Sequence, residues 1–576
     1  MGRSAAGRAL ELPVEARGAA LGAALGLYVA GGALALWAAA RAVRRGLRER
    51  GLAGARALEG AAEEEGPAAR FGRACGLAGE GELEGLRADL RAQLEEGLKG
   101  ASATDKTSKT AKRGTIKEPR VRMLPTFVES LPSGEEDGVF WALDLGGTNF
   151  RSVRVRLQKP VKTSRQSVGA TRSRSSILFG SKPMVLAREV PIPEELLTGT
   201  ADALFDFMAK NLLAHAAEIA AAEEPPAAGG GRAKFSPAAF SPDIGFTFSY
   251  PCEQTSLRAG RLVKWTKGFS VTGAEGEDVV QLLQRAMKRA GCPGASIKAL
   301  VNDTVGTLAA AVHKDKAAVV GMILGTGTNA AYMERLDRIE KLDSAAKASP
   351  EDNMVINCEW GNARSPAFPF VEADFEVDNI SPNPGEQTFE KMVSGLYLGD
   401  LVRRSLVHLL RDGSLGEVGV SPGAQRALQT ALLGSTLPTS AVSEIDSDTS
   451  SLEQVRHTLE AALKVPECPD EFCVLAQTVC ASLRQRSGRM VAAGLAAILD
   501  NHTAAWGASQ GKRRVVAVDG GLYEHYPRLR QAIHDGLAEL LGPDSGVEFT
   551  EVSDGSGLGA ALLAATALSY NYSSRG

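Results

Sequence analysis

Residues 140–156 read FWALDLGGTNFRSVRVR, and this stretch decides the fold. Residues 139–143 are an apolar run of strand length, and residues 152–157 alternate polar with apolar side chains, so we expect two strands. The intervening LGGTN at 145–149 is short enough to close them into a hairpin. Its two adjacent glycines let backbone N–H groups approach an anion without a Cβ in the way, as in phosphate-binding turns. The stretch predicts an anion site at a hairpin tip.

Charged side chains flank this turn. Asp144 stands at the end of the first strand and is placed to hold Mg²⁺ through water, because Mg²⁺ keeps several of its waters in proteins. Arg151 supplies a fixed cation close by. An ordinary Gly-Gly hairpin with a capping Asp explains the same residues equally well. Other turns of the chain decide between the two interpretations.

Three further glycine-rich turns occur along the chain. The apolar run at 318–324 leads into GTGTN at 325–329, and residues 515–518 lead into DGGL at 519–522. The last turn, SDGSGLG at 553–559, opens an Ala-rich C-terminal helix. An ordered set of such turns in both halves is far more specific than one loop. It predicts a two-lobed, duplicated α/β phosphotransferase fold.

A further segment carries candidate acid–base chemistry. Residues 299–307 read ALVNDTVGT, a buried strand that ends in polar residues at the start of a helix. In open α/β sheets ligands bind beyond the carboxyl ends of strands, where Asn302 and Asp303 lie. Asp303 can accept a proton from a substrate hydroxyl while Asn302 holds its neighbour. The alternative is an Asp that only caps the helix, with Thr304 in its first turn.

Two more elements are expected between these motifs. Residues 195–222 have helical periodicity. Residues 244–250 form a strand that stops at Pro251, because proline removes the next ladder donor.

Bulk composition narrows the function classes. A hydrophobic content of 44% and a charged content of 23% are those of a globular protein with large cores. The net charge of −3 does not indicate nucleic-acid binding. The seven cysteines are an odd number and scattered, which predicts free thiols in a reducing compartment and no zinc site. The histidines lie outside the turns, so histidine catalysis is not required.

The N-terminal region carries a candidate membrane anchor. Residues 18–40 contain no charge and are long enough to span about 30 Å of hydrocarbon as a helix. The arginines at 41–50 should stay on the cytosolic side and keep the remaining chain there. A cleaved signal or transit peptide is the alternative.

Between the anchor and the motifs we expect a flexible connection. Residues 41–80 combine the basic flank with a stalk without periodicity, and Leu83, Leu86, Leu90 and Leu94 then recur at helical spacing. The basic, hydroxyl-rich stretches at 101–120 and 159–182 are interpreted as surface segments, the second with a phosphosite cluster as its alternative.

The combined motifs resemble those of eukaryotic hexokinases of the membrane-anchored plant and green-algal type, within the sugar kinase/actin/Hsp70 fold family. The match extends from about Gly81 to Leu568. It rests on MLPTFVESLP at Met123, LDLGGTNFR at Leu143, GFTFSYPCEQTSL at Gly245, KWTKGF at Lys264, VNDTVGTL at Val301, GTGTN at Gly325, EWGN at Glu359, FEKMVSGLYLGDLVRR at Phe389, VDGGLYEHYP at Val518 and SDGSGLGAALLAA at Ser553.

The resemblance implies a fold and its division along the chain. The fold is α/β, a two-lobed duplicated actin-like ATPase (ribonuclease H-like) fold with an N-terminal transmembrane helix. The expected segments are a tail at 1–17, the anchor at 18–40, the flank and stalk at 41–80, an N-terminal helix and lead-in of the large lobe at 81–135, the small lobe with insertions at 136–301, the large lobe at 302–556 and a C-terminal helix returning to the small lobe at 557–576.

The resemblance also implies an activity, the ATP-dependent phosphorylation of the 6-hydroxyl of D-glucose and related hexoses, which feeds glycolysis. ATP and Mg²⁺ are the implied cofactors, and Asp303 is similar to the family's general base, with Lys267 and Arg151 as further catalytic groups. The implied sugar-binding residues are Ser249, Tyr250, Thr266, Lys267, Asn302, Asp303, Asn329, Glu359 and Glu390. The implied nucleotide-binding residues are Asp144, Leu145, Gly146, Gly147, Thr148, Asn149, Thr326 and, near the adenosine, Ser443, Gly520, Gly521 and Leu522.

Two positions and one segment depart from the family pattern. Ala363 follows EWGN where the family usually has an aromatic residue, residues 364–384 are atypical, and Leu558 stands where many members have a basic residue. These departures leave hexose preference and affinity open.

Two rival functions fit part of the motifs. A catalytically silent glucose sensor is disfavoured because it has no need of Asp303, Asp144 and both phosphate turns. A bacterial-type glucokinase is disfavoured by KWTKGF and FEKMVSG. We expect a monomer with its catalytic part in the cytosol, anchored to the mitochondrial outer membrane or, second, to the plastid outer envelope.

Overall fold

The computed structural model describes residues 67–76, 81–100, 119–159, 183–223, 235–266, 268–411, 420–449, 451–507 and 513–569. The predicted anchor at 18–40, most of the stretches at 101–120 and 159–182, and Lys267 lie outside these residues. The chain divides into two compact units. One comprises Met1–Leu83, Pro369–Val377 and Leu398–Ser487, and the other comprises Glu84–Phe368, Asp378–Tyr397 and Gly488–Gly576. Both large sheets belong to the second unit.

The five-stranded sheet has the order β4-β3-β2-β5-β8. Its strands are β2 (Gly138–Leu145), β3 (Asn149–Leu157), β4 (Met184–Pro191), β5 (Asp243–Phe248) and β8 (Ser296–Val301). The predicted hairpin is confirmed, since β2 and β3 are antiparallel and Asp144 pairs with Arg151. Strands β2, β5 and β8 are parallel. Strand β5 ends two residues earlier than the predicted strand at 244–250.

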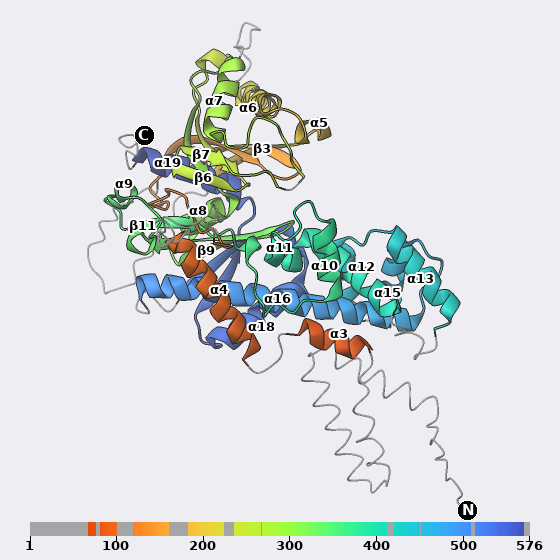
Figure 1. The fold of residues 1–576 in the computed structure, drawn as a ribbon. Helices are drawn as coiled ribbons and strands as arrows, with labels where there is room; N and C mark the ends of the chain where they lie inside the picture. Colours follow the sequence, from red (N-terminus) through yellow and green to blue (C-terminus); the bar gives the residue numbers. More distant parts are fainter. Residues whose placement is uncertain are drawn as a thin grey trace, which may run out of the picture. The chain divides into compact units, whose positions relative to one another are not determined.

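Both faces of this sheet are covered, and the period of β2 shows how. Phe140 and Ala142 lie in a core with α8 (Asp303–Lys314) and α19 (Gly555–Ser569). Trp141 and Leu143 lie in a second core with α6 (Ala201–Glu223) and α7 (Val279–Arg289), on the opposite face (Figure 1). Successive strand residues point to opposite faces, so a strand covered on both sides is a continuous apolar run.

The six-stranded sheet has the order β1-β11-β10-β9-β12-β13. Its strands are β1 (Leu124–Pro125), β9 (Ala318–Leu324), β10 (Thr328–Arg335), β11 (Asn353–Asn357), β12 (Arg514–Asp519) and β13 (Val547–Glu551). Strands β9 and β10 form an antiparallel hairpin around GTGTN, which repeats the arrangement of β2 and β3. Strands β9, β12 and β13 are parallel. A separate hairpin consists of β6 (Cys252–Ser256) and β7 (Ala259–Leu262).

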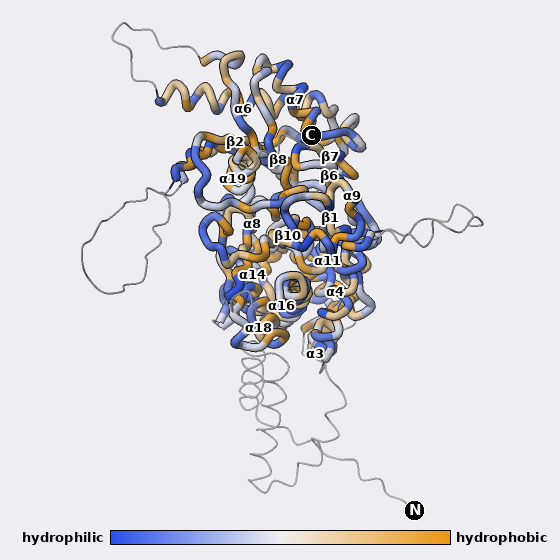
Figure 2. Tube along the Cα trace, turned by 90° about the vertical axis from the view of Figure 1, so that its left-hand side faces the viewer, coloured by the Kyte–Doolittle hydropathy of each residue, from blue (hydrophilic) through white to orange (hydrophobic). Residues whose placement is uncertain are grey.

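Two glycine-containing helices connect the sheets. Helix α8 packs on β9 and β10, α19 packs on β2 and β5, and the two helices pack on each other. A Cβ added to Gly559 would lie 1.9 Å from the carbonyl oxygen of Gly306, a separation that no side chain tolerates. The backbones are therefore in direct contact. Figure 2 shows the hydrophobic character of both helices, as expected for elements buried between two sheets.

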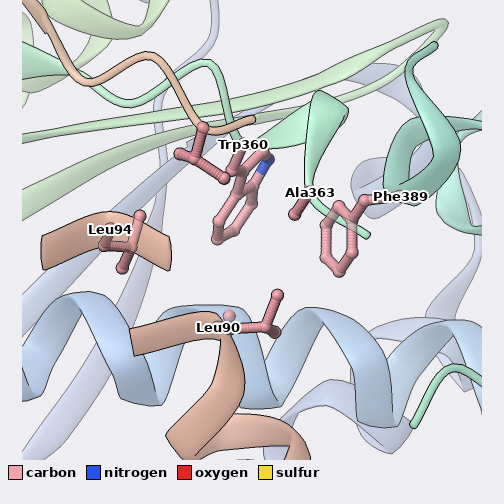
Figure 3. Close-up of a pocket in the computed structure, with 7 residues that line it drawn as sticks. Leu90, Leu94, Trp360, Ala363 and Phe389 are labelled. Atoms are coloured by element: carbon pink, nitrogen blue, oxygen red, sulfur yellow. The ribbon is translucent and has the colours of Figure 1, made fainter. Parts of the chain in front are cut away.

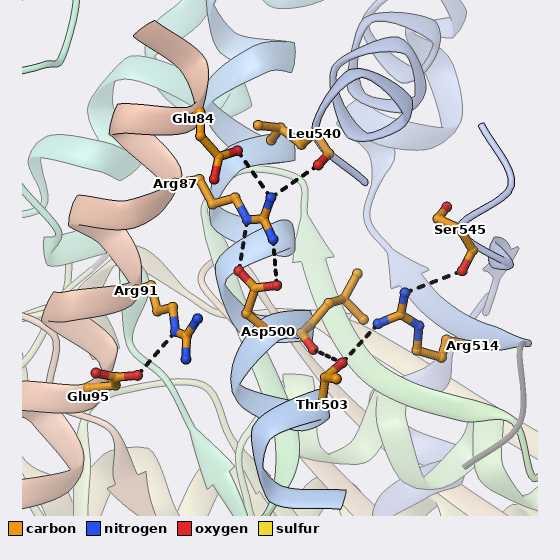
Figure 4. A network of polar contacts seen from close by, with 10 residues as sticks. Glu84, Arg87, Arg91, Glu95, Asp500, Thr503, Arg514, Leu540 and Ser545 are labelled. Carbon is orange, nitrogen blue, oxygen red and sulfur yellow. Dashed lines mark hydrogen bonds and ion pairs between the residues drawn. The ribbon is translucent and has the colours of Figure 1, made fainter. Parts of the chain in front are cut away.

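The predicted leucine helix is confirmed as α4 (Glu82–Lys99), in which Leu86, Leu90 and Leu94 are buried. An arginine on its other side, Arg87, bonds it to Asp500 and Leu540 within the second unit. The Arg87 guanidinium donates to both carboxylate oxygens of Asp500, at 2.8 and 2.7 Å, and to the carbonyl oxygen of Leu540 at 3.1 Å (Figure 4). This bidentate geometry is the strong form of an Arg–carboxylate pair.

The remaining helices have the following bounds. They are α3 (Pro67–Cys75), α5 (Glu194–Leu197), α9 (Ser344–Lys347), α10 (Glu372–Ile380), α11 (Thr388–Val393), α12 (Gly395–Arg411), α13 (Pro422–Gly434), α14 (Thr439–Ser447), α15 (Glu453–Leu463), α16 (Asp470–Trp506), α17 (Gly521–His525), α18 (Pro527–Leu541) and the 3-10 turns η3 (Pro237–Ala239), η4 (Leu336–Arg338) and η5 (Trp360–Asn362).

Two expectations about helices were wrong in part. The stretch at 41–80 was expected to lack regular structure, but Pro67–Cys75 form α3, and Cys75 is buried. The single helix expected at 195–222 is two helices, α5 and α6, separated around Gly199. A Cβ on Gly199 would lie 2.9 Å from the carbonyl oxygen of Glu195, so a tight turn occurs there.

The first unit contains a buried ion pair of its own. Arg486 is fully buried and donates to both carboxylate oxygens of Asp374, at 2.7 and 2.8 Å. All seven cysteines are free, as predicted. Among the described helices, none is both long enough and apolar enough to cross a membrane.

Candidate active site

Parallel strand ends bring the candidate residues together. In the five-stranded sheet, β2, β5 and β8 end side by side, which places Asp144, Ser249 and Asn302 at one edge. In the six-stranded sheet, β9 and β12 end side by side, so the GTGTN turn lies beside Gly520. A Cβ on Gly325 would lie 3.4 Å from the Cα of Gly520. The edges of both sheets therefore present polar residues and glycine turns.

Three of the implied sugar-binding residues form one hydrogen-bonded network. The side-chain amide of Asn329 donates to Asn302 Oδ1 at 3.4 Å, to Asn357 Oδ1 at 2.8 Å and to Glu359 Oε1 at 3.2 Å. Asn357 also donates to Glu359 Oε1 at 2.9 Å, and the Glu359 backbone N–H donates to Asn329 Oδ1 at 3.0 Å. Amides and carboxylates in such a network offer donors and acceptors to the hydroxyls of a sugar.

Asn302 itself is the N-cap of α8. Its Oδ1 accepts from the backbone N–H of Thr304 at 3.0 Å and from the Thr304 hydroxyl at 2.6 Å. The alternative in which Asp303 caps the helix is therefore wrong, because Asn302 fills that place. Asp303 is the first residue of the helix.

Glu390 is held through the second glycine–threonine turn. Its Oε2 accepts from the Thr328 backbone N–H at 2.9 Å. The Thr328 hydroxyl in turn accepts from the Trp360 indole N–H at 3.2 Å and donates to the carbonyl oxygen of Ile323 at 3.0 Å. Because Trp360 follows Glu359, Thr328 is bonded both to Glu390 and to the neighbour of Glu359, the two carboxylates implied for sugar binding.

The other implied sugar-binding residues are less closely joined to the network. Tyr250 lines a small cavity with Asn302 and Asn357, but its hydroxyl donates to the Gly146 carbonyl oxygen at 2.8 Å. Its ring is buried against Trp265. Tyr250 thus supports the first phosphate turn. Ser249 is buried, Thr266 is half-buried, and Lys267 lies outside the described residues.

The first turn is held by backbone contacts. The Gly146 N–H donates to the Asn149 carbonyl oxygen at 3.1 Å, and the Thr148 carbonyl oxygen accepts from Ile192 at 2.9 Å. The Asn149 side chain donates to Glu189. Thr148 is exposed, whereas the Leu145 side chain is buried, so only the backbone of Leu145 faces the turn.

Asp144 has one satisfied and one unsatisfied carboxylate oxygen. The Ser556 hydroxyl donates to Oδ2 at 2.6 Å, and the buried Oδ1 has no hydrogen-bond partner. Desolvation raises the pKa of Asp144 to about 6, and nearby Asp303 adds to this, while the Ser556 hydrogen bond opposes it. Arg151 does not bond Asp144, because it pairs with Asp554 at 2.9 Å and Glu189 at 3.3 Å.

A second carboxylate of this kind lies at the end of β12. Asp519 accepts from the Gly555 backbone N–H at 3.0 Å. Burial raises the pKa of Asp519 to about 6, the Gly555 hydrogen bond opposes this shift, and nearby Asp303 and Asp554 add to it. Several carboxylates in one partly desolvated place repel one another and favour a bound cation.

These residues fit a magnesium ion bound mostly through water and phosphate. The unpartnered Oδ1 of Asp144 is an available hard oxygen ligand. Within the described residues no group of three His, Cys, Asp or Glu side chains could hold a metal. A site with one or two carboxylates is the usual arrangement for Mg²⁺ bound together with a nucleotide.

The implied adenosine residues fall in two parts of the chain. Gly520, Gly521 and Leu522 join β12 to α17, and the Gly520 backbone has φ +133°, a conformation that favours glycine. The Leu522 side chain is buried. Ser443 lies on α14, within the first unit.

Sequence reasoning missed four polar residues of the site. Asn357 ends a strand whose central residues, Met354–Ile356, are apolar and buried, and that change of character was its only signal. Ser556, Asp519 and Asp554 stand in turns that drew attention for their glycines alone.

Comparison with known proteins covers nearly the whole described chain. Residues 75–313 and residues 319–566 match two sequence families, each described as hexokinase. Hexokinase-7 of Oryza sativa subsp. japonica is 40% identical over 482 residues, which are 82% of this chain and 94% of that protein. The chain belongs to the hexokinase family. Hexokinase-2, chloroplastic, of Nicotiana tabacum is 41% identical over 461 residues, 78% of this chain and 83% of that protein.

A solved structure extends the comparison to the fold. The hexokinase from Schistosoma mansoni complexed with glucose is similar with a TM-score of 0.66 and 30% identity, over 87% of this chain and 98% of that one. The two mixed sheets of this hexokinase are those of the two-lobed, actin-like sugar kinase fold that the turns predict.

A group of apolar side chains lies beside Glu359 and Glu390, the two carboxylates that the resemblance implies for sugar binding. Trp360, next to Glu359, and Phe389, next to Glu390, lie with ring centroids 5.4 Å apart. Leu90 and Leu94 of α4 face these rings, and Ala363 lies between them (Figure 3). A small apolar cavity lies there, with Ala363 in its lining.

Proposed function

We propose that this hexokinase transfers the γ-phosphoryl group of ATP to the 6-hydroxyl of D-glucose and related hexoses. The observation that carries the proposal is the place of Asp303, beside Asn302 of the amide–carboxylate network and near enough to Asp144 and Asp519 to raise the pKa of both. The similar hexokinase of Schistosoma mansoni is complexed with glucose, which supports the choice of sugar.

In this proposal the polar network orients the sugar. Asn302, Asn329, Glu359 and Glu390, with Ser249, Thr266 and Lys267, receive the ring hydroxyls. Asn357 stiffens the network, because it bonds both Asn329 and Glu359. Holding the hydroxyl in line with the phosphoryl group supplies much of the catalysis, since phosphoryl transfer depends mainly on positioning and charge.

The nucleotide lies along the glycine turns. Backbone N–H groups of Leu145, Gly146, Gly147, Thr148 and Asn149, with Thr326, approach the phosphates, and Gly520, Gly521, Leu522 and Ser443 approach the adenosine. Mg²⁺, held through Asp144, would neutralise phosphate charge. Arg151 contributes positive charge from the pair that it forms with Asp554.

Asp303 acts as the general base. Its carboxylate takes the proton of the 6-hydroxyl as O6 forms a bond to the γ-phosphorus, and the bond from that phosphorus to the bridging oxygen breaks to release ADP. Residues 136–301 and 302–556 are the two lobes of the proposal, and their closure keeps water from competing for the phosphoryl group.

The test is a coupled assay of ADP formation with glucose, on the full chain and on Asp303→Ala. The parent is expected to phosphorylate glucose, and the variant to lose roughly 10²–10⁴ in rate while still binding glucose. A parent that binds glucose without consuming ATP would overturn the proposal and favour a sugar sensor.

We also propose that residues 18–40 anchor the protein to an organelle membrane, with the mitochondrial outer membrane first and the plastid outer envelope second. The uncharged length of the segment and the arginines at 41–50 support this. The word chloroplastic in the name of the tobacco relative supports organelle association in general. Full-length protein should stay in the membrane fraction at alkaline pH, and a mature protein that begins after residue 40 would contradict an anchor. A monomer is expected in detergent.

A further inference from the structure

The second glycine–threonine turn has two different neighbours. Gly325, at its start, lies beside Gly520 of the adenosine turn, where a Cβ would be 3.4 Å from the Gly520 Cα. Gly327, two residues later, lies beside Glu390, where a Cβ would be 2.5 Å from Oε2. The nucleotide and the sugar sides therefore meet within three residues.

The Gly327 contact concerns the carboxylate and not the backbone. Gly327 is absent from the positive-φ glycines of the described chain, so alanine imposes no backbone strain there. The group that a methyl would meet is the far end of a flexible side chain, which moves at little cost to folding. What must change is the place of the Glu390 carboxylate, which accepts the Thr328 N–H at 2.9 Å.

Thr328 fixes the same carboxylate from the other side. It is 4% exposed, and its hydroxyl is bonded both to the Ile323 carbonyl oxygen and to the Trp360 indole. Strand β9 and the segment after Glu359 thus set the position of the N–H that holds Glu390. The backbone of the turn is also bonded to the start of α12, since Gly395 N–H donates to the Gly325 oxygen at 2.8 Å.

We propose that Gly327 and Thr328 are positioning residues for the sugar, acting through Glu390, although they stand in a turn whose first residues serve the nucleotide. The inference rests on the proposed function, because it takes Glu390 as a sugar ligand. In this inference, the absence of a Cβ at Gly327 leaves room for the Glu390 carboxylate in the position that binds the sugar.

The test uses Gly327→Ala in the full chain. Its glucose KM and its glucose Kd, the latter measured by calorimetry without ATP, should both rise about ten- to a hundredfold, as when a hydrogen bond to a charged group is lost. The KM for MgATP should change by less than about threefold. The melting temperature should stay near that of the parent, because only the far end of the Glu390 side chain has to move. The matched variant Gly325→Ala, whose methyl would make only ordinary contact with Gly520 and would not meet Glu390, should leave the glucose Kd near the parent value.

A double-mutant cycle with Glu390→Ala tests the route. If Gly327→Ala acts through Glu390, it adds nothing to the glucose Kd in that background, because neighbours in one contact are not additive. Thr328→Val, which loses the hydroxyl, should weaken glucose binding. Thr328→Ser, which keeps the hydroxyl, should bind glucose like the parent. Full additivity in the cycle, or a rise in the MgATP KM alone, would overturn the inference while leaving the proposed function intact. A parent that does not bind glucose would overturn both.

Discussion

The residues proposed to bind the sugar (the sugar side) and those proposed to bind the nucleotide (the nucleotide side) of this hexokinase are arranged differently. On the sugar side, Asn329, Asn357 and Glu359 satisfy one another through four side-chain and backbone bonds. On the nucleotide side, Asp144 keeps a buried oxygen without a partner, and burial raises the pKa of Asp144 and Asp519 to about 6.

This difference matches the chemistry of the ligand proposed for each side. A neutral sugar with several hydroxyl groups binds best to side chains that are already fixed in place, because preorganised donors and acceptors lose little entropy on binding. A polyanion with its cation is best met by backbone turns and by carboxylates that lack compensation until a cation arrives. Substitutions on the two sides should therefore separate the two substrates.

The largest expected separation comes from Asp144→Ala. Removing the unpartnered carboxylate should lower kcat/KM for MgATP by about a hundredfold or more, as expected when a carboxylate that holds the metal is lost. The glucose Kd, measured by calorimetry without nucleotide, should not change. A comparable loss of glucose affinity would show that the two sides are not separate.

Asn357→Ala should give the opposite result. Because it removes one partner each from Asn329 and Glu359, the glucose KM should rise about ten- to a hundredfold, with the MgATP KM within about threefold. Asn353→Ala, at the other end of β11, is the matched control and should leave both constants near the parent values. Steady-state kinetics with both substrates varied gives the two KM values for each variant.

Ser556→Ala tests the nucleotide side further and should change the MgATP KM by a smaller factor. It leaves Asp144 Oδ2 without its donor, so the MgATP KM should rise about three- to tenfold, less than for Asp144→Ala because the change reaches the nucleotide only through Asp144. Ser569→Ala, at the end of the same helix, removes a hydroxyl that only bonds the Ala565 carbonyl oxygen. If the two variants behave alike, the bond to Asp144 has no role in nucleotide binding.

Glu136→Gln, outside both sides, should alter stability and neither KM. Desolvation opposes ionisation of Glu136, but His313 and the N–H and hydroxyl of Ser133 lower its pKa to about 2, from 4.5 in the unfolded chain. This lowered pKa stabilises the fold above pH 4.5, and the contribution is lost as pH falls toward 2. The variant should be less stable by about 2 kcal/mol at pH 7, with the gap closing in acid. A gap that stays constant with pH in chemical denaturation would contradict this.

The sequence predicted those parts of the site that depend on local chemistry. The two hairpin turns and the strand end before Asp303 lie where the sequence predicts them, because a strand end and a tight turn leave their mark within a few residues. Asn357 was missed because its role depends on the pairing of β10 with β11, in which Ala331 is opposite Asn357. Extending that register brings Asn329 to Glu359.

Long-range partners account for the other misses. Ser556 bonds Asp144 from 412 positions away, and no spacing rule predicts such a contact. The hydrogen bond that the Tyr250 hydroxyl donates to the Gly146 carbonyl oxygen joins residues 104 positions apart and was likewise not predicted. Helix α3 was missed because an Ala-, Glu- and Gly-rich stretch has no clear period, whereas the leucine face of α4 does.

The crossing of α8 and α19 has a mechanical consequence. With the backbone of Gly559 against the Gly306 carbonyl, no interlocking side chains stand between the helices at that point. Because backbone meets backbone there, the contact fixes how closely the two helices approach, and no side chain at that point can adjust their separation. Any side chain added at Gly306 or Gly559 would push the two helices apart, and with them the two sheets on which they pack.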